Sequence, residues 1–154
     1  MHLWKLEKWK KCYCEDNLKS GLYLRFNKGV DPQIKKAAKN FCKWLPKKYY
    51  FPLRVTVQIV DSYRVKAEYG ELVCVRFIKL PEPRIKIASG DFNEIAIDEG
   101  SPVALEEVLF SIGYGLTQYF QWINGIHLTE KGMKRQLNIY ADKVLSEYTN
   151  DSDV

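Results

Sequence analysis

Hydrophobic residues recur at helical spacing in three parts of the chain. The first run follows Asp31-Pro32, a helix-capping residue before the residue type favoured at the first helical position, and continues to residue 45, where Pro46 interrupts it. The second run follows Ser101-Pro102 and lasts to residue 123, and the third covers residues 129–148. The sequence therefore predicts helices over residues 32–45, 102–123 and 129–148.

Between the first two helices, hydrophobic and polar residues alternate in the manner of strands. Residues 53–60 and 84–88 show this pattern, and residues 21–26 show it before the first helix. Residues 71–79 are predicted to form a further strand, because they are rich in β-branched and aromatic residues. Residues 92–97 either extend the same sheet or cover its edge, and the first twenty residues allow a short amphipathic helix. The chain is therefore predicted to be an α+β protein in which an N-terminal helix packs on a small mixed or antiparallel sheet.

The length of 154 residues is that of one domain, so we expect a single domain over residues 1–154, with a basic, aromatic segment at 1–30 and a polar tail at 149–154. The apolar stretches are too short for a membrane-spanning helix, and lysines interrupt the first dozen residues, so neither a membrane nor a secretory signal is predicted. The four cysteines, Cys12, Cys14, Cys42 and Cys74, are then expected to be ordinary reduced thiols of a cytoplasmic protein. Cys12 and Cys14 lack the second Cys or His pair of a zinc module.

Positive charge is concentrated in the N-terminal third of the chain. Residues 1–50 hold 13 Lys+Arg against 4 Asp+Glu, a balance of 13 − 4 = +9, whereas residues 51–154 hold 11 against 15, a balance of −4. The aromatic residues interleaved with these lysines are Trp4, Trp9, Tyr13, Trp44, Tyr49 and Tyr50. Such a composition fits a surface that binds nucleic acid, and it equally fits a solvated lysine face over an aromatic core.

The long helix carries the most specific motif. Residues 114–122 read Tyr-Gly-Leu-Thr-Gln-Tyr-Phe-Gln-Trp, and this stretch resembles the active-site helix of zincin metallopeptidases, which in some soluble members reads roughly HELTHYFQW. In such a helix two histidines four residues apart bind zinc, and the adjacent glutamate acts as general base on the metal-bound water. The resemblance covers the non-catalytic positions and fails at the catalytic ones, where this chain has Tyr114, Gly115 and Gln118.

The third zinc ligand of such families is an acidic residue on the following helix, in a pattern like ExxAxxYA. Residues 134–141 match this pattern with Lys134 at the ligand position. An amide is a poor zinc ligand, a phenol must ionise to become a good one, and an ammonium group repels a dication. The resemblance therefore implies a minimal zincin-like fold with a buried former active-site helix, and it implies that no metal or other cofactor is bound.

A zincin-like fold also implies a substrate groove between the long helix and an edge strand. We expect this strand to be residues 84–88, and we place Arg84, Lys86 and Gln121 beside the groove. The two histidines, His2 at a terminus and His127 in a loop, lie on no element expected to hold them beside a nucleophile. The leading hypothesis is a catalytically inactive metallopeptidase-like module that binds a protein or peptide partner. The alternative is a nucleic-acid-associated protein that uses its N-terminal third.

Overall fold

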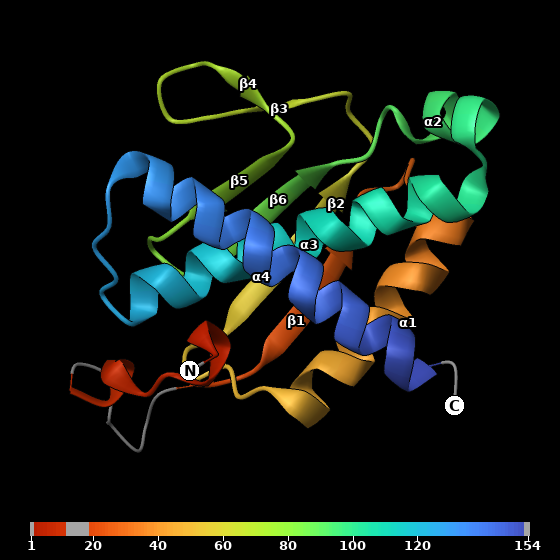
Figure 1. The fold of residues 1–154 in the computed structure, drawn as a ribbon. Helices are drawn as coiled ribbons and strands as arrows, with labels where there is room; N and C mark the ends of the chain where they lie inside the picture. The colour runs from red at the N-terminus through yellow and green to blue at the C-terminus, as the bar shows by residue number, and fades with distance from the viewer. Residues whose placement is uncertain (1, 12–18, 153–154) are drawn as a thin grey trace.

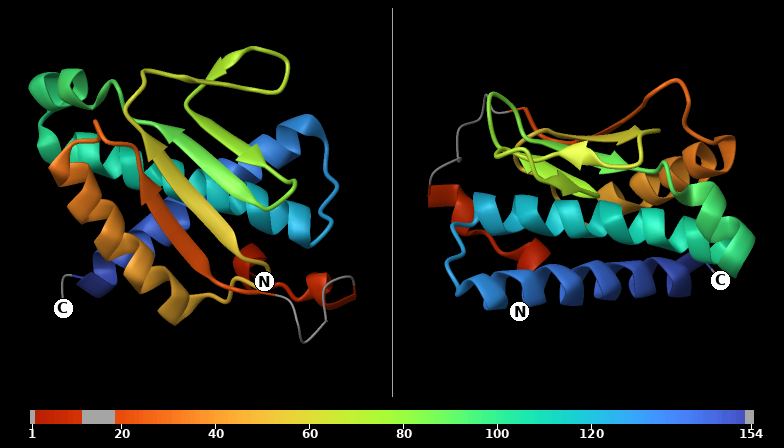
Figure 2. Two further views of the ribbon diagram at one scale, coloured as in Figure 1. Left: turned by 180° about the vertical axis from the view of Figure 1, so that it is seen from behind. Right: turned by 90° about the horizontal axis from the view of Figure 1, so that it is seen from above.

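The computed structural model describes residues 2–11 and 19–152, and it has a layered α+β architecture (Figure 1). A four-stranded sheet with the order β1-β2-β6-β5 forms one layer, α3 packs on one face of it, and α4 packs on α3 (Figure 2, right). Helix α1 covers the same face beside β1 and contacts both β1 and α3. The predicted α+β class is confirmed.

The sheet is mixed. Strands β1 (Leu22–Phe26), β2 (Val55–Val60) and β6 (Arg84–Ala88) run parallel, whereas β5 (Val75–Ile78) runs antiparallel to β6. Strands β3 (Val65–Lys66) and β4 (Leu72–Val73) form a separate antiparallel hairpin. The predicted strand at residues 71–79 is therefore divided at Cys74, because its first part pairs with β3 and its second part pairs with β6.

Helix α1 (Pro32–Lys48) begins where the sequence predicts. The Asp31 side chain accepts a hydrogen bond from the main-chain N–H of Gln33 at 2.8 Å, which caps the first turn. The helix does not stop before Pro46 as expected, because a proline in the last turn removes only one main-chain hydrogen bond and the turn still closes from Tyr49 N to Leu45 O at 2.9 Å. Its buried residues, facing the core, are Ile34, Ala38, Phe41 and Leu45.

Helix α3 (Ser101–Ile123) is the central element of the core, as its long apolar stripe predicts. It lies between the sheet and α4 (Glu130–Ser152) (Figure 1). The two helices approach closely at Gly113, where an added Cβ would lie 3.2 Å from the Ala141 Cα. The polar tail expected from residue 149 onward continues α4 as far as Ser152. Residues 149–151 are exposed, and Asp151 accepts a 2.9 Å hydrogen bond from Trp44 Nε1.

Residues 92–97, expected either to extend the sheet or to cover its edge, do not extend it and form helix α2 (Phe92–Glu99). Phe92 is buried and anchors its first turn, while Gly100 ends it with φ 97°, a value that favours glycine. The N-terminus forms two 3-10 turns, Leu3–Lys5 and Lys8–Lys11, in place of a short amphipathic helix. Over the described residues, no helix combines the length and apolarity needed to cross a membrane.

Candidate functional site

The free edge beside Tyr114 and Gln118 belongs to β5, and not to residues 84–88 as expected, while β1 forms the opposite edge of the sheet. Strand β6 pairs with β2 on one side and with β5 on the other, so it lies inside the sheet. Ala88 N donates to Cys74 O at 2.9 Å, which makes this pair hydrogen-bonded. Hydrogen-bonded and non-bonded pairs alternate in antiparallel strands, so the main-chain N–H and C=O groups of Val75 and Phe77 point away from β6.

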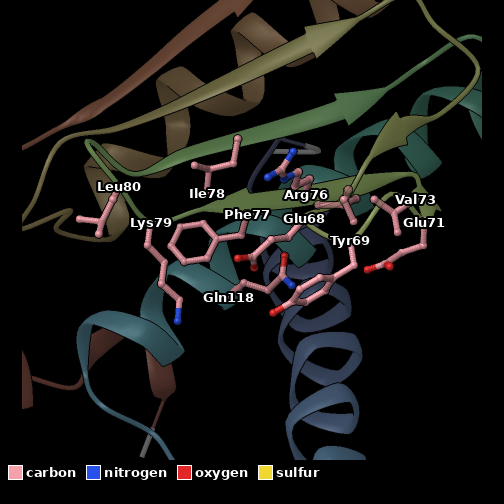
Figure 3. Close-up of a pocket in the computed structure, with 12 residues that line it drawn as sticks. Glu68, Tyr69, Glu71, Val73, Arg76, Phe77, Ile78, Lys79, Leu80 and Gln118 are labelled. Carbon is pink, nitrogen blue, oxygen red and sulfur yellow. The ribbon is translucent and has the colours of Figure 1, made fainter.

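Two adjoining hollows follow this free edge, and together we call them the β5 groove. The first, of about 660 Å³, lies between β5, the loop of the β3–β4 hairpin and Gln118 of α3 (Figure 3). The second, of about 480 Å³, is lined by Val73, Cys74, Val75, Phe110, Ser111, Tyr114, Gln118 and Lys134. Val73, Val75 and Gln118 line both hollows, so the groove runs continuously beside the unpaired strand.

Three of the four positions that the motif singles out meet in this groove. Tyr114 and Gln118 stand one turn apart on α3, and Lys134 reaches the same hollow from α4. The sequence predicts this convergence, because Tyr114 and Gln118 are four residues apart and so lie on one face of a helix, and because Lys134 occupies the third-ligand position on the following helix. A groove beside an unpaired strand with these three side chains offers hydrogen-bond donors and a positive charge to a ligand.

Tyr114 is half-buried in the groove, with its ring 6.4 Å from that of Phe110 between centroids. Burial raises the pKa of the Tyr114 phenol above its ordinary value of 10. The phenol is therefore neutral at physiological pH and serves as a hydrogen-bonding group, since zinc binding would require the phenolate.

Gln118 carries the least satisfied polar atom of the groove. Its Oε1 is inaccessible to solvent and has no hydrogen-bond partner among the described residues. Its amide extends from α3 toward β5 and the hairpin residues Glu68 and Tyr69 (Figure 3). An unpaired buried amide oxygen costs about 1–3 kcal/mol, so a donor that enters the groove and reaches this oxygen gains a favourable contact.

The fourth position, Gly115, faces the sheet. A Cβ at this position would lie 2.3 Å from Ile85 Cγ2 and 3.2 Å from Val75 Cγ1, so α3 crosses the sheet at a distance that only glycine permits. Gly113 and Gly115 both mark close packing contacts of α3. Neither hollow of the groove includes Gly115 among its lining residues.

Substituting Gly115 with alanine is expected to lower the free energy of unfolding by about 1–2 kcal/mol, even though alanine favours a helix by about 1 kcal/mol. The reason is the 2.3 Å approach of the new methyl group to Ile85. Gly113→Ala, whose new methyl group would come no closer than 3.2 Å to its neighbour, is the matched comparison and is expected to lose less of the free energy of unfolding. Urea denaturation of both variants measures the difference, and a stabilised Gly115→Ala variant would contradict the packing argument.

The remaining residues assigned to the groove lie elsewhere. Arg84 and Lys86 alternate with the buried Ile85 and Ile87 along β6, so they occupy the sheet face opposite α3. Gln121 is 4% exposed and its Nε2 donates to Met133 O at 3.1 Å and to Gln136 Oε1 at 2.9 Å. Gln121 therefore ties α3 to the start of α4. These three assignments are wrong because strand order and helix rotation depend on packing that the sequence alone does not reveal.

Much of the aromatic content of the N-terminal third is committed to packing. Trp4 and Tyr49 are buried in the core, and Trp44 is half-buried with its indole N–H bound to Asp151. Tyr50 is 60% exposed, and Tyr13 lies outside the described residues. The core therefore accounts for most of the aromatic residues in this segment.

His2 is held more firmly than its position near the terminus predicts. Its Nδ1 accepts a hydrogen bond from Trp4 N at 3.1 Å, and its Nε2 lies 3.1 Å from the hydroxyl of Tyr49, which in turn donates to Glu147. Burial is the main cause that lowers the pKa of His2. The cluster joins the N-terminal turn to the end of α1 and to α4, so tertiary contacts with Trp4, Tyr49 and Glu147 fix His2 in place.

The described thiols and carboxylates do not gather into a metal-ligating cluster. Within residues 2–11 and 19–152, no three His, Cys, Asp or Glu side chains lie close enough to share an ion. Burial raises the pKa of the Cys42 thiol to about 12, so this thiol stays protonated, while Cys74 is exposed at the groove. Cys12 and Cys14 lie outside the described residues.

Comparisons of the chain with protein-family models, with curated proteins and with solved structures find no match.

Proposed function

We propose that this protein is a catalytically inactive metallopeptidase-like module that binds an extended peptide segment of a protein partner in the β5 groove. The observation that carries the proposal is the free edge of β5 beside Tyr114, Gln118 and Lys134. A peptide that adds to a sheet edge gains affinity from main-chain hydrogen bonds and specificity from pockets for alternate side chains.

The outward main-chain groups of Val75 and Phe77 are suited to pair with such a peptide. Gln118 stands below this edge and its unpaired Oε1 can accept a hydrogen bond from a donor on the peptide. Lys134 is exposed at the end of the second hollow and would favour an acidic side chain or a terminal carboxylate.

The same side chains argue against hydrolysis in this groove. The neutral phenol of Tyr114, the amide of Gln118 and the ammonium of Lys134 do not form a zinc site, and Gly115 brings no base. Each of these groups can nevertheless hold a ligand in place through hydrogen bonds or charge. A retained groove without catalytic groups fits a binding role.

Blocking the free edge of β5 should weaken peptide binding strongly without unfolding the protein. Peptides of about ten residues are selected from a random displayed library on the immobilised protein, and their affinities are measured by fluorescence anisotropy. Val75→Pro is expected to weaken the selected peptides at least about tenfold, because it removes an outward N–H that pairs with no neighbouring strand. Lys134→Glu is expected to lower the affinity for those peptides that carry an acidic residue by a similar factor.

Val75→Ala is the matched control, because it also shortens the side chain and keeps the main-chain N–H. It is expected to retain most of the affinity. Equal losses in Val75→Ala and Val75→Pro would assign the effect to packing against α3, and full binding by Val75→Pro would refute strand addition. Circular dichroism of each variant verifies the fold.

A further inference from the structure

The face of the sheet opposite α3 is covered by none of the described helices (Figure 2, left). Along β1, β2 and β6 the residues of this face alternate with buried or half-buried ones that point toward the helices. The open face carries two rows that run across the strands. The row Tyr23-Thr56-Arg84 and the row Arg25-Gln58-Lys86-Arg76 follow from the strand registers.

The open face is strongly cationic. Its positive side chains are Arg25, Arg54, Arg76, Arg84 and Lys86, and the acidic side chain among them is Glu82, which pairs with Arg54 at 2.6 Å. Arg25, Arg84 and Lys86 form no ion pair with any described residue. Arg76 and Lys86 stand directly opposite each other on neighbouring strands, an arrangement of like charges that destabilises a sheet.

An aromatic side chain lies within the same surface. Tyr23 is 51% exposed, and the guanidinium of Arg54 lies 5.7 Å from the centre of its ring. Tyr23, Arg25, Arg54 and Arg84 line one shallow hollow of about 350 Å³ on this face. An exposed aromatic ring on a strand, framed by arginines, can stack a planar base while the cations contact phosphates.

We infer that the open face of the sheet binds single-stranded nucleic acid, with phosphates on Arg25, Arg84 and Lys86 and a base stacked on Tyr23. Charge complementarity favours a polyanion, because an anion relieves the repulsion between unpaired cations on adjacent strands. The ring of Tyr23 favours an unpaired base over a duplex, whose bases are already stacked on one another. The open face adjoins the β5 groove at Arg76. The residues assigned to the contact, Tyr23, Arg25, Arg84 and Lys86, line neither hollow of the groove, so their test does not depend on the proposed function.

The probe is a fluorescein-labelled oligouridylate of about 15 nucleotides, titrated with the full chain at several salt concentrations. The double variant Arg84→Glu/Lys86→Glu is expected to bind at least about tenfold more weakly at low salt. The plot of log binding constant against log salt concentration should become shallower by about 1.4, because two phosphate contacts are lost and each contributes about 0.7 to the slope. Arg25→Glu is a second variant on another strand and is expected to act in the same direction.

Lys131→Glu/Arg135→Glu changes the net charge equally on the exposed surface of α4 and is the matched control. Tyr23→Leu should lower the affinity for the oligouridylate at least about fivefold and leave the affinity for inorganic polyphosphate unchanged. An equal loss in the α4 control, no binding by the unmodified protein, or no effect of Tyr23→Leu would overturn the inference. Oligoglutamate or a duplex that binds as tightly as the oligouridylate would overturn it as well.

Discussion

Replacing Trp4 with alanine is expected to lower the free energy of unfolding by about 3–5 kcal/mol. The indole is 2% exposed, its Nε1 donates to Thr117 Oγ1 at 3.1 Å, and its ring stacks on Phe120 with centroids 5.0 Å apart. The substitution leaves a large cavity between the N-terminal turn and α3, and it removes a hydrogen bond within the core. Urea denaturation monitored by circular dichroism measures the loss.

Trp9→Ala is the matched control, because Trp9 is half-buried and its main-chain N–H, bound to Asn124 Oδ1 at 3.2 Å, survives the substitution. We expect this variant to lose about 1 kcal/mol or less. If Trp9→Ala were the more damaging change, the N-terminal segment would not be anchored through Trp4. The outcome bears on function, since a Trp4 that anchors the core is not available to stack on a base.

The elements of the fold could be read from the sequence where one periodicity persists over many residues. The stripe of α3 and the alternation of β2 and β6 are of this kind, and their limits agree closely with the structure. Residues 92–97 offered too few positions to distinguish a helix from a strand. The polar last turn of α4 is held to α1 by Asp151, which binds Trp44 and Lys48. Short or polar segments depend on such tertiary contacts.

The candidate site could be predicted in part. The spacing of Tyr114 and Gln118 fixes them on one helix face, so their convergence with Lys134 followed from the motif. The edge strand could not be predicted, because alternation in residues 84–88 describes an inner strand with one open face as well as an edge strand. The placement of Arg84 and Lys86 depended on that assignment, and their true position on the open face is visible only once the strand order is known.

Rebuilding the three ligand positions tests whether the resemblance to a zinc-binding helix extends to geometry. The variant Tyr114→His/Gln118→His/Lys134→Glu places two imidazoles and a carboxylate in one hollow, a ligand set that zinc favours. We expect it to bind about one zinc ion per chain. Zinc at about 100 times its Kd should then raise the free energy of unfolding by about 2.7 kcal/mol, whereas the unmodified protein should show no such shift.

The matched control keeps both histidines and moves the acidic residue to Lys131, an exposed position that lines neither hollow of the groove. With one ligand fewer, its zinc-dependent stabilisation should be clearly smaller in thermal melts and in direct titration. Adding Gly115→Glu to the rebuilt site should not create a peptidase, because a side chain at residue 115 collides with Ile85 instead of entering the groove. Equal zinc binding by the control, or none by the rebuilt variant, would mean that Tyr114, Gln118 and Lys134 share a hollow without the geometry of a former metal site.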